Sequence, residues 1–214
     1  MKALLFDIDG TLLDTREFIL QTYERVLKKH NGPVFERSEL IKHVGGGSLI
    51  TNYPKILPGM DVQILMQDHK DIHAELLHLI VSYKDVHDVL TTLKKKYKVA
   101  AVTGRTKKSA YTNMKNHGLT DYFEFITTAE DVKNPKPDPE GIIQALSFFK
   151  IQPHEALMIG DADSDIEAGK RAGVKTVAIT HGFFDREYLS KYEPDYIIDT
   201  LPELLSLCEE SESN

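Results

Sequence analysis

Three aspartates directly follow apolar runs of the sequence and could supply the carboxylates of a site that transfers phosphoryl groups. Asp7 and Asp9 come after the first run, and Asp161 follows another run that ends at Gly160. A carboxylate is a competent nucleophile towards phosphorus, so Asp7 could carry an aspartyl-phosphate. Magnesium prefers hard oxygen ligands, and Asp7 and Asp161 are suitable carboxylates for it. Asp9 lies two residues past Asp7, where a carboxyl group could protonate the leaving oxygen and later activate water.

Three further polar groups could bind the oxygens of the phosphoryl group itself. Thr103 and Gly104 follow the second apolar run, and Lys136 lies between two prolines in a loop after the third. A hydroxyl, a backbone N–H and an ammonium can stabilise the negative charge that is spread over these oxygens. Each residue alone has an ordinary structural explanation, such as a turn, a helix cap or a solvated side chain. Because each follows an apolar run, their combination favours a metal-bridged phosphate site.

Other metal-binding motifs fit the sequence less well. The acidic spacing after Asp161 resembles a calcium-binding loop, but Ile166 replaces the glycine, and Ala172 the final glutamate, that such a loop requires. His69 and His73 are four residues apart, as zinc ligands on a helix can be, but no glutamate lies between them. We therefore expect these histidines to be packed inside the protein or at an interface.

The apolar runs are short and are separated by amphipathic stretches. This alternation predicts buried parallel strands connected by helices, and therefore a three-layer α/β fold with right-handed crossovers. Because ligands bind at the carboxyl ends of parallel strands, the polar residues that follow the runs should meet at one edge of the sheet. The predicted strands are Ala3–Phe6, Val99–Val102, Phe123–Ile126, Ala156–Ile159 and Val174–Ile179.

Caps and turns indicate where some of the connecting helices begin and end. Asp138 is expected to be the N-cap of one helix, because Pro139 follows it in the first turn. A second helix is predicted over Ser164–Ala172, and Gly173 would end it. Cys208 is expected on one face of a helix near the C-terminus.

One long segment lacks the alternation of strands and helices. Residues 14–82 contain helical patterns but no convincing strand. We therefore predict a catalytic core of residues 1–13 and 83–214 that is interrupted by a helical insertion. The Lys42–Ser48 stretch of this insertion is polar and glycine-rich, and it could recognise the leaving group or simply be a solvated connector. It is not a P-loop, because no Gly-Lys-Ser or Gly-Lys-Thr ending follows.

Composition restricts the classes of partner and compartment. The chain has 214 residues, a net charge of −7 and 41% hydrophobic residues, which suits one compact domain with an insertion. The negative charge argues against nucleic acid as a partner. No apolar stretch is long enough to span a bilayer, and Asp7 interrupts the N-terminal apolar run before a signal-peptide core could form. A single cysteine favours a reducing compartment, so we expect a cytoplasmic protein, either a monomer or a homodimer.

Taken together, the motifs resemble those of the haloacid dehalogenase-like hydrolase superfamily. The first to fourth motifs of that superfamily are similar, in this order, to Asp7–Thr15, Thr103, Lys136–Glu140 and Gly160–Gly169. The resemblance covers essentially the whole predicted core. It implies a Rossmann-like core with a parallel sheet and an inserted α-helical cap.

The resemblance also implies a role for each motif residue. Asp7 would be the nucleophile and Asp9 the general acid and base. Mg²⁺ would be bound by Asp7, by the backbone carbonyl of Asp9 and by Asp161. Asp165 would support the site, either through Lys136 or through a metal-bound water.

Within the superfamily, the sequence is most similar to the group of phosphoglycolate phosphatases and inorganic pyrophosphatases. Phosphoglycolate phosphatases usually have Asn after the Thr of the second motif, whereas this chain has Gly104 and Arg105. The expected reaction is hydrolysis of a small phosphorylated metabolite or of pyrophosphate. Dehalogenases of the superfamily lack the second aspartate, so Asp9 argues against carbon–halogen hydrolysis. A sugar phosphomutase shares all four motifs, and a non-catalytic phosphoaspartate switch is a further alternative.

Overall fold

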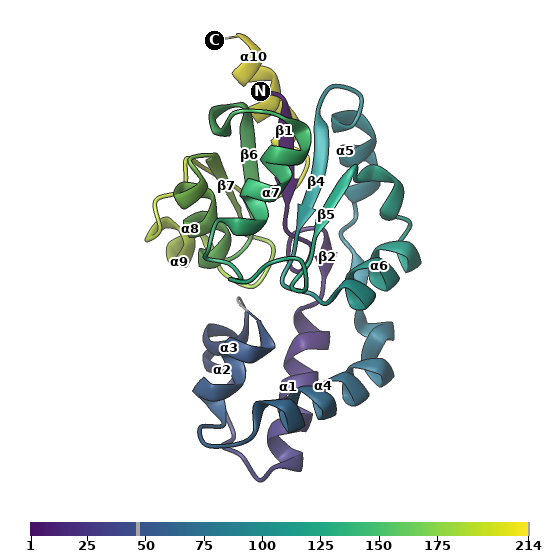
Figure 1. Cartoon of the computed structure of the whole chain (residues 1–214), viewed down its shortest axis with the longest axis vertical. Helices are drawn as coiled ribbons and strands as arrows, with labels where there is room; N and C mark the ends of the chain where they lie inside the picture. Colours follow the sequence, from purple (N-terminus) through teal and green to yellow (C-terminus); the bar gives the residue numbers. More distant parts are fainter. Residues whose placement is uncertain (46–47, 214) are drawn as a thin grey trace.

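The computed structural model describes residues 1–45 and 48–213, and its core is a parallel β-sheet of six strands (Figure 1). The strands are β1 (Ala3–Phe6), β4 (Lys98–Val102), β5 (Phe125–Thr127), β6 (Ala156–Gly160), β7 (Lys175–Ile179) and β8 (Tyr196–Ile198). Their order in the sheet is β5-β4-β1-β6-β7-β8, and every neighbouring pair is parallel. The fully buried β1 therefore lies in the interior of the sheet, between β4 and β6.

Both faces of the sheet are covered by helices. These are α5 (Val86–Leu93), α6 (Lys107–Asn116), α7 (Glu140–Phe149), α8 (Asp163–Ala172), α9 (Arg186–Ser190) and α10 (Glu203–Ser213). Alternate residues of a strand point to opposite faces. Leu4 and Phe6 accordingly pack in one apolar cluster with residues of α5, α6 and α10, where Cys208 is buried, whereas Ala3 and Leu5 pack in a second cluster with residues of α7 and α8. This three-layer arrangement confirms the predicted α/β fold class.

The structure differs from the sequence prediction at several element ends. The third predicted strand is found at Phe125–Thr127 rather than Phe123–Ile126. β8, at one edge of the sheet, is absent from the prediction, although Tyr196–Ile198 is a short apolar run before Asp199 like those that mark the other strands. Pro139 rather than Asp138 is the N-cap residue of α7, although the Asp138 carboxylate accepts a hydrogen bond from the Glu140 N–H at 3.0 Å.

Residues 14–82, which we call the helical segment, contain a group of helices with its own apolar cluster. The helices are α1 (Arg16–Lys29), α2 (Arg37–Val44), α3 (Leu49–Ile56) and α4 (Val62–Leu76), followed by a 3-10 turn at Leu77–Leu79. Tyr23, Leu40, Tyr53 and Leu65 are buried between them. Figure 1 shows these helices beyond the carboxyl ends of the strands, on the side opposite the two termini. The helical segment thus faces the edge of the sheet at which the polar residues are expected.

Two short strands connect the helical segment with the core. In β2 (Leu13–Asp14) and β3 (Val81–Ser82), Leu13 lies opposite Ser82 and Asp14 opposite Val81 in an antiparallel pair. The expectation of no strand within residues 14–82 is therefore wrong at both ends of the segment. Strands of two residues are too short to show an alternating pattern. The pair holds the two chain crossings between the core and the helical segment side by side.

The helical segment also packs against the core through apolar side chains beyond β7. Ile19 of α1 and Ile41 of α2 contact a buried cluster that contains Phe183 and Phe184, in the loop between β7 and α9. Gly45, directly after α2, lies so close that an added Cβ would be 3.2 Å from the Phe184 ring. Among the described helices, none combines the length and apolar character needed to cross a membrane.

Candidate active site

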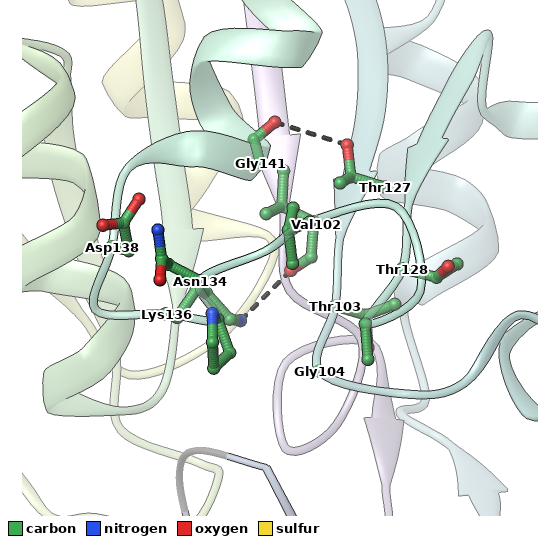
Figure 2. A pocket seen from close by; sticks show the side chains of 12 residues that line it. Val102, Thr103, Gly104, Thr127, Thr128, Asn134, Lys136, Asp138 and Gly141 are labelled. Atoms are coloured by element: carbon green, nitrogen blue, oxygen red, sulfur yellow. Dashed lines mark hydrogen bonds between the residues drawn. The ribbon is translucent and has the colours of Figure 1, made fainter.

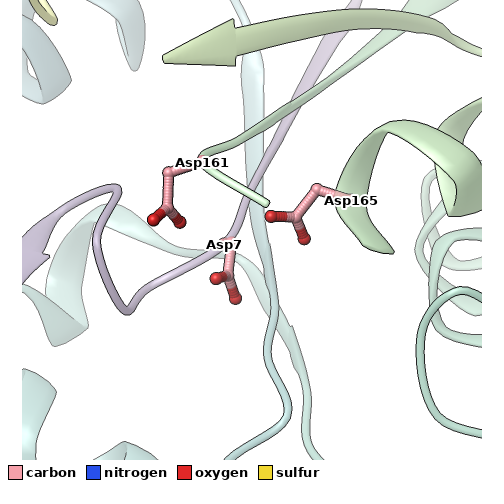
Figure 3. A group of neighbouring side chains, drawn as sticks. All are labelled: Asp7, Asp161 and Asp165. Atoms are coloured by element: carbon pink, nitrogen blue, oxygen red, sulfur yellow. The ribbon is translucent and has the colours of Figure 1, made fainter. Parts of the chain in front are cut away.

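Neighbouring strand ends bring three carboxylates together. Phe6 lies opposite Ile159 in adjacent parallel strands, so Asp7 and Asp161 both extend from the carboxyl edge of the sheet. Asp165 joins them from the first turn of α8. One oxygen of each carboxylate lies within 4.8 Å of the others, and all three residues are buried (Figure 3). Within the described part of the chain, this is the one group of three such side chains that could hold a metal ion.

Lys136 connects two of these carboxylates. Its ammonium lies 2.8 Å from Asp7 and 2.6 Å from Asp165, and it also donates to the Val102 carbonyl at 3.1 Å (Figure 2). Burial acts to lower the pKa of Lys136, but the two carboxylates raise it by more, so the ammonium keeps its charge. Of the two supporting roles considered for Asp165, the contact through Lys136 is therefore present in the structure.

The three carboxylates of Asp7, Asp161 and Asp165 could carry more negative charge than the ammonium of Lys136 balances. Burial raises the pKa of Asp7 to about 7, and Asp165 and Asp9 act in the same direction against Lys136. Burial, Asp165 and Asp7 also raise the pKa of Asp161 well above its usual range. Buried carboxylates that repel one another are the hard-oxygen donors that a divalent cation prefers, and such a cation would compensate their charge. The residues present therefore fit a divalent metal.

Glycines and one backbone N–H give these carboxylates their positions. A Cβ at Gly160 would lie 2.2 Å from an Asp165 oxygen, and a Cβ at Gly182 would lie 2.2 Å from an Asp161 oxygen, so a side chain at either position would displace the carboxylate. The Phe183 N–H donates to Asp161 at 2.7 Å. The residue types of Gly182 and Phe183 do not by themselves predict this contribution, although a glycine soon after the apolar run of β7 is a signal that the sequence contains.

Thr103 and Gly104 lie beside Lys136 at the same edge of the sheet. All three line a small cavity, together with Thr127 (Figure 2). The Thr103 N–H donates to the Thr127 carbonyl at 3.0 Å, and the Thr103 hydroxyl accepts from the Arg105 N–H at 3.2 Å. Gly104 is exposed, so its backbone is open to a ligand. The structure thus brings both residues close to the ammonium with which the sequence analysis grouped them.

Asp9 has a partner that the sequence analysis did not identify. The Arg105 guanidinium donates from Nε and Nη2 to the two carboxylate oxygens of Asp9, at 2.7 and 2.5 Å. Burial acts to raise the pKa of Asp9, but the charge and hydrogen bonds of Arg105 lower it below the usual range. The residues are 96 positions apart, and no local pattern connects them. The sequence shows only that Gly104 and Arg105 follow Thr103 where phosphoglycolate phosphatases usually have Asn.

The paired histidines of α4 are packing residues, as expected. Burial lowers the pKa of His69 to about 3 and that of His73 to about 4, so both rings are neutral near pH 7. The Tyr53 hydroxyl lies 2.7 Å from Nδ1 of His69, and the His73 ring packs edge-on against Phe18 at 4.3 Å between centroids. Neither histidine belongs to the described group of candidate metal ligands.

The Lys42–Ser48 stretch is only partly described, because residues 46–47 lie outside the described residues. Lys42 is exposed in the last turn of α2, and the His43 ring packs against Phe35 at 5.4 Å between centroids. Neither observation brings these side chains to the carboxylates. A role of the stretch in recognition of the leaving group therefore stays a prediction.

Known proteins share both the sequence pattern and the fold of this chain. The family model for haloacid dehalogenase-like hydrolases matches residues 4–179. Pyrophosphatase PpaX from Bacillus velezensis is 34% identical over 208 residues, which cover 97% of this chain and 96% of the relative. A hydrolase of the haloacid dehalogenase-like family from Streptococcus pneumoniae superposes with a TM-score of 0.85 at 24% identity, covering 97% of this chain and 98% of that chain. A predicted phosphoglycolate phosphatase from Haemophilus somnus gives a TM-score of 0.85 at 22% identity, with the same coverage of 97% and 98%. At these identities the two structures show a shared fold.

Proposed function

Because the chain belongs to the haloacid dehalogenase-like hydrolases and is a phosphatase-type enzyme, we propose that it is a magnesium-dependent phosphohydrolase of small metabolites. The observation that carries the proposal is the position of Asp7 at the end of β1, in contact with Lys136 and grouped with two further buried carboxylates. This arrangement supports a nucleophilic carboxylate beside a cation site.

The proposed reaction has two steps at one phosphorus atom. A carboxylate oxygen of Asp7 attacks phosphorus, the bond to the leaving oxygen breaks, and an aspartyl-phosphate forms. Water then attacks the same phosphorus, which releases inorganic phosphate and restores the carboxylate. Lys136, the Thr103 hydroxyl and the Gly104 N–H bind the phosphoryl oxygens and stabilise the charge that they carry.

Asp7, Asp161 and the backbone carbonyl of Asp9 would hold Mg²⁺. When bound, the metal supplies positive charge that balances the phosphoryl oxygens and orients the phosphoryl group. Asp161 suits this role because its described partners, the Thr11 hydroxyl and the Phe183 N–H, are neutral. Asp165 already shares the ammonium of Lys136, and we assign it a supporting role.

Asp9 is the proposed general acid and base. In its protonated form it gives a proton to the leaving oxygen, and the resulting carboxylate takes a proton from the attacking water. Its position at the turn after β1, facing the helical segment through Arg105 and Phe18, suits contact with the leaving part of a substrate.

We propose that the helical segment is a cap that encloses the substrate. Its helices lie beyond the carboxyl ends of the strands (Figure 1), where a cover would exclude water and strengthen the electrostatics of the site. Enclosure favours compact substrates such as pyrophosphate or phosphoglycolate, after which the relatives from Bacillus velezensis and Haemophilus somnus are named. The net charge of −7 disfavours polyanionic polymers, and we expect the enzyme to act in the cytoplasm, as a monomer or homodimer.

A phosphate-release assay tests the proposal. Phosphoglycolate, pyrophosphate, small sugar phosphates, nucleotides and a phosphopeptide are compared with magnesium and with a chelator. We expect magnesium-dependent release from at least one compact substrate and little from the phosphopeptide. Full activity in chelator, or preference for the phosphopeptide, would contradict the proposal. Conversion of a sugar phosphate into its isomer without phosphate release would support a phosphomutase instead, and a stable phosphoaspartate without turnover would support a switch.

A further inference from the structure

Arg105 lies at the junction between the core and the helical segment. It is in the loop between β4 and α6, and its side chain is only 7% exposed. Beyond its two hydrogen bonds to Asp9, Nη1 donates to the Ser109 hydroxyl at 2.9 Å. The guanidinium carbon lies 5.6 Å from the centre of the Phe18 ring on α1. Core residues thus accept the hydrogen bonds of the guanidinium, and Phe18 brings the helical segment next to it.

The ion pair between Arg105 and Asp9 occupies the carboxyl group that the proposed reaction uses as general acid and base. Both oxygens of Asp9 accept hydrogen bonds from Arg105, whereas proton transfer to a leaving oxygen requires one of them to face the substrate. A buried ion pair is also a weak stabilising device, because apolar residues of similar volume often stabilise a fold as well. Opening one of the two hydrogen bonds would free an Asp9 oxygen to turn towards the leaving oxygen of a bound substrate.

An oxyanion is the group that can replace Asp9 on this cation. The planar guanidinium binds carboxylates and phosphates through two parallel hydrogen bonds. The transferred phosphoryl group already has the proposed contacts to Lys136, Thr103 and Gly104. The oxyanion that reaches Arg105 must then belong to the leaving part of the substrate, which is the part on which Asp9 acts.

We propose that Arg105 is a specificity-determining residue that exchanges the Asp9 carboxylate for an oxyanion on the leaving part of the substrate, and thereby frees Asp9. The oxyanion is a carboxylate or a second phosphate. The proposal rests on the phosphohydrolase function proposed above. If the leaving part of a substrate is neutral, Arg105 stays hydrogen-bonded to Asp9, and the substrate reacts more slowly.

The test compares substrates that differ in the charge of the leaving part. Phosphoglycolate and pyrophosphate carry a second oxyanion, and 2-hydroxyethyl phosphate replaces the carboxylate of phosphoglycolate by a neutral group. We measure kcat/KM for each with the wild type, Arg105→Met and Arg105→Lys in the presence of magnesium. In Arg105→Met, the preference for phosphoglycolate over 2-hydroxyethyl phosphate should fall by about 10- to 100-fold, as expected for lost charge-assisted hydrogen bonds. Arg105→Lys keeps the positive charge but loses the two parallel hydrogen bonds of the planar guanidinium, so it should recover part of that preference.

Lys107→Met is the matched control, since it removes an exposed cation two residues away and should leave the substrate ranking unchanged. The phosphoglycolate and pyrophosphate arms distinguish a carboxylate from a phosphate as the group bound. The proposal is overturned if the wild type shows no preference for either anionic leaving part, or if both Arg105 variants reduce the rates for all three substrates equally. Absence of hydrolysis of every substrate by the wild type would instead remove the proposed function itself.

Discussion

Asp7 and Asp9 are two residues apart, yet their surroundings shift their pKa values in opposite directions. Burial raises the pKa of Asp7, whereas Arg105 outweighs burial and lowers that of Asp9. The proposed first step needs the reverse, with Asp7 ionised and Asp9 protonated. A cation among the carboxylates would lower the pKa of Asp7, and departure of Arg105 would raise that of Asp9. Binding of metal and substrate would thus prepare both residues for their roles.

In metal-free protein, Asp7→Asn should stabilise the fold at about pH 8 but not at about pH 4. The pKa of this carboxyl is raised from 3.8 to about 7 in the folded state. Between these values the folded protein binds more protons than the unfolded chain, so stability falls as pH rises through this window. Asparagine removes that loss, and the gain at the higher pH should be on the order of a few kcal/mol.

Denaturant unfolding of both proteins in chelator measures this difference in the free energy of unfolding. Both proteins contain the same buried histidines, so the contribution of histidine titration cancels in the comparison. A difference that is the same at both pH values would show that the carboxyl of Asp7 keeps its ordinary pKa in the folded state.

Among the elements, the loop after β7 helps to position the Asp161 carboxylate, as the ends of the strands do. Phe183 donates its N–H to Asp161, and Gly182 leaves the space that this carboxylate occupies. Gly182→Ala should therefore displace Asp161 and raise the magnesium concentration needed for half-maximal activity by about tenfold or more, as for other changes beside metal ligands. A magnesium titration of phosphate release measures the shift.

Gly59→Ala is the control for this prediction. It adds the same methyl group where no heavy atom lies within 4 Å. Its left-handed backbone makes the change mildly destabilising, but the magnesium requirement should not change. An unaltered requirement in Gly182→Ala would mean that the loop does not position the metal ligand.

The arrangement of strands and loops explains why only part of the site could be predicted from the sequence. Asp7, Asp161 and Lys136 could be identified because each follows an apolar run, and the parallel sheet brings the ends of such runs together. The contact between Asp9 and Arg105 depends on how two loops fold relative to one another, and no period or spacing encodes it. Likewise, the pair of β2 and β3 is formed by two residues on each side, which is too short for any pattern.

For the whole molecule, the contact between the helical segment and the core should control which substrates enter. Ile19 and Ile41 pack on the cluster of Phe183 and Phe184, and the Phe184 ring also stacks on Tyr188 at 4.3 Å between centroids. Phe184→Leu should loosen this contact, because a smaller side chain fills less of the interface. We expect the preference for phosphoglycolate over a phosphotyrosine peptide to fall several-fold in kcat/KM.

The control is Phe148→Leu, at a residue of α7 that is 53% exposed. It makes the same chemical change away from the helical segment and should keep the wild-type preference. If Phe184→Leu and Phe148→Leu discriminate between the two substrates as well as the wild type, the packed contact does not enclose the site.

If the phosphoryl group passes through Asp7, as proposed, a trapped phosphoenzyme should show it directly by its mass. In Asp9→Asn, a substrate with a good leaving group should still phosphorylate Asp7, because its leaving oxygen needs little protonation. Hydrolysis should be slow, because water lacks its base. Peptide mass spectrometry should then find one phosphoryl group on the peptide that contains Asp7, and none when Asp7→Asn is added. A phosphoryl group on another residue, or normal turnover with no phosphorylated peptide, would contradict the account.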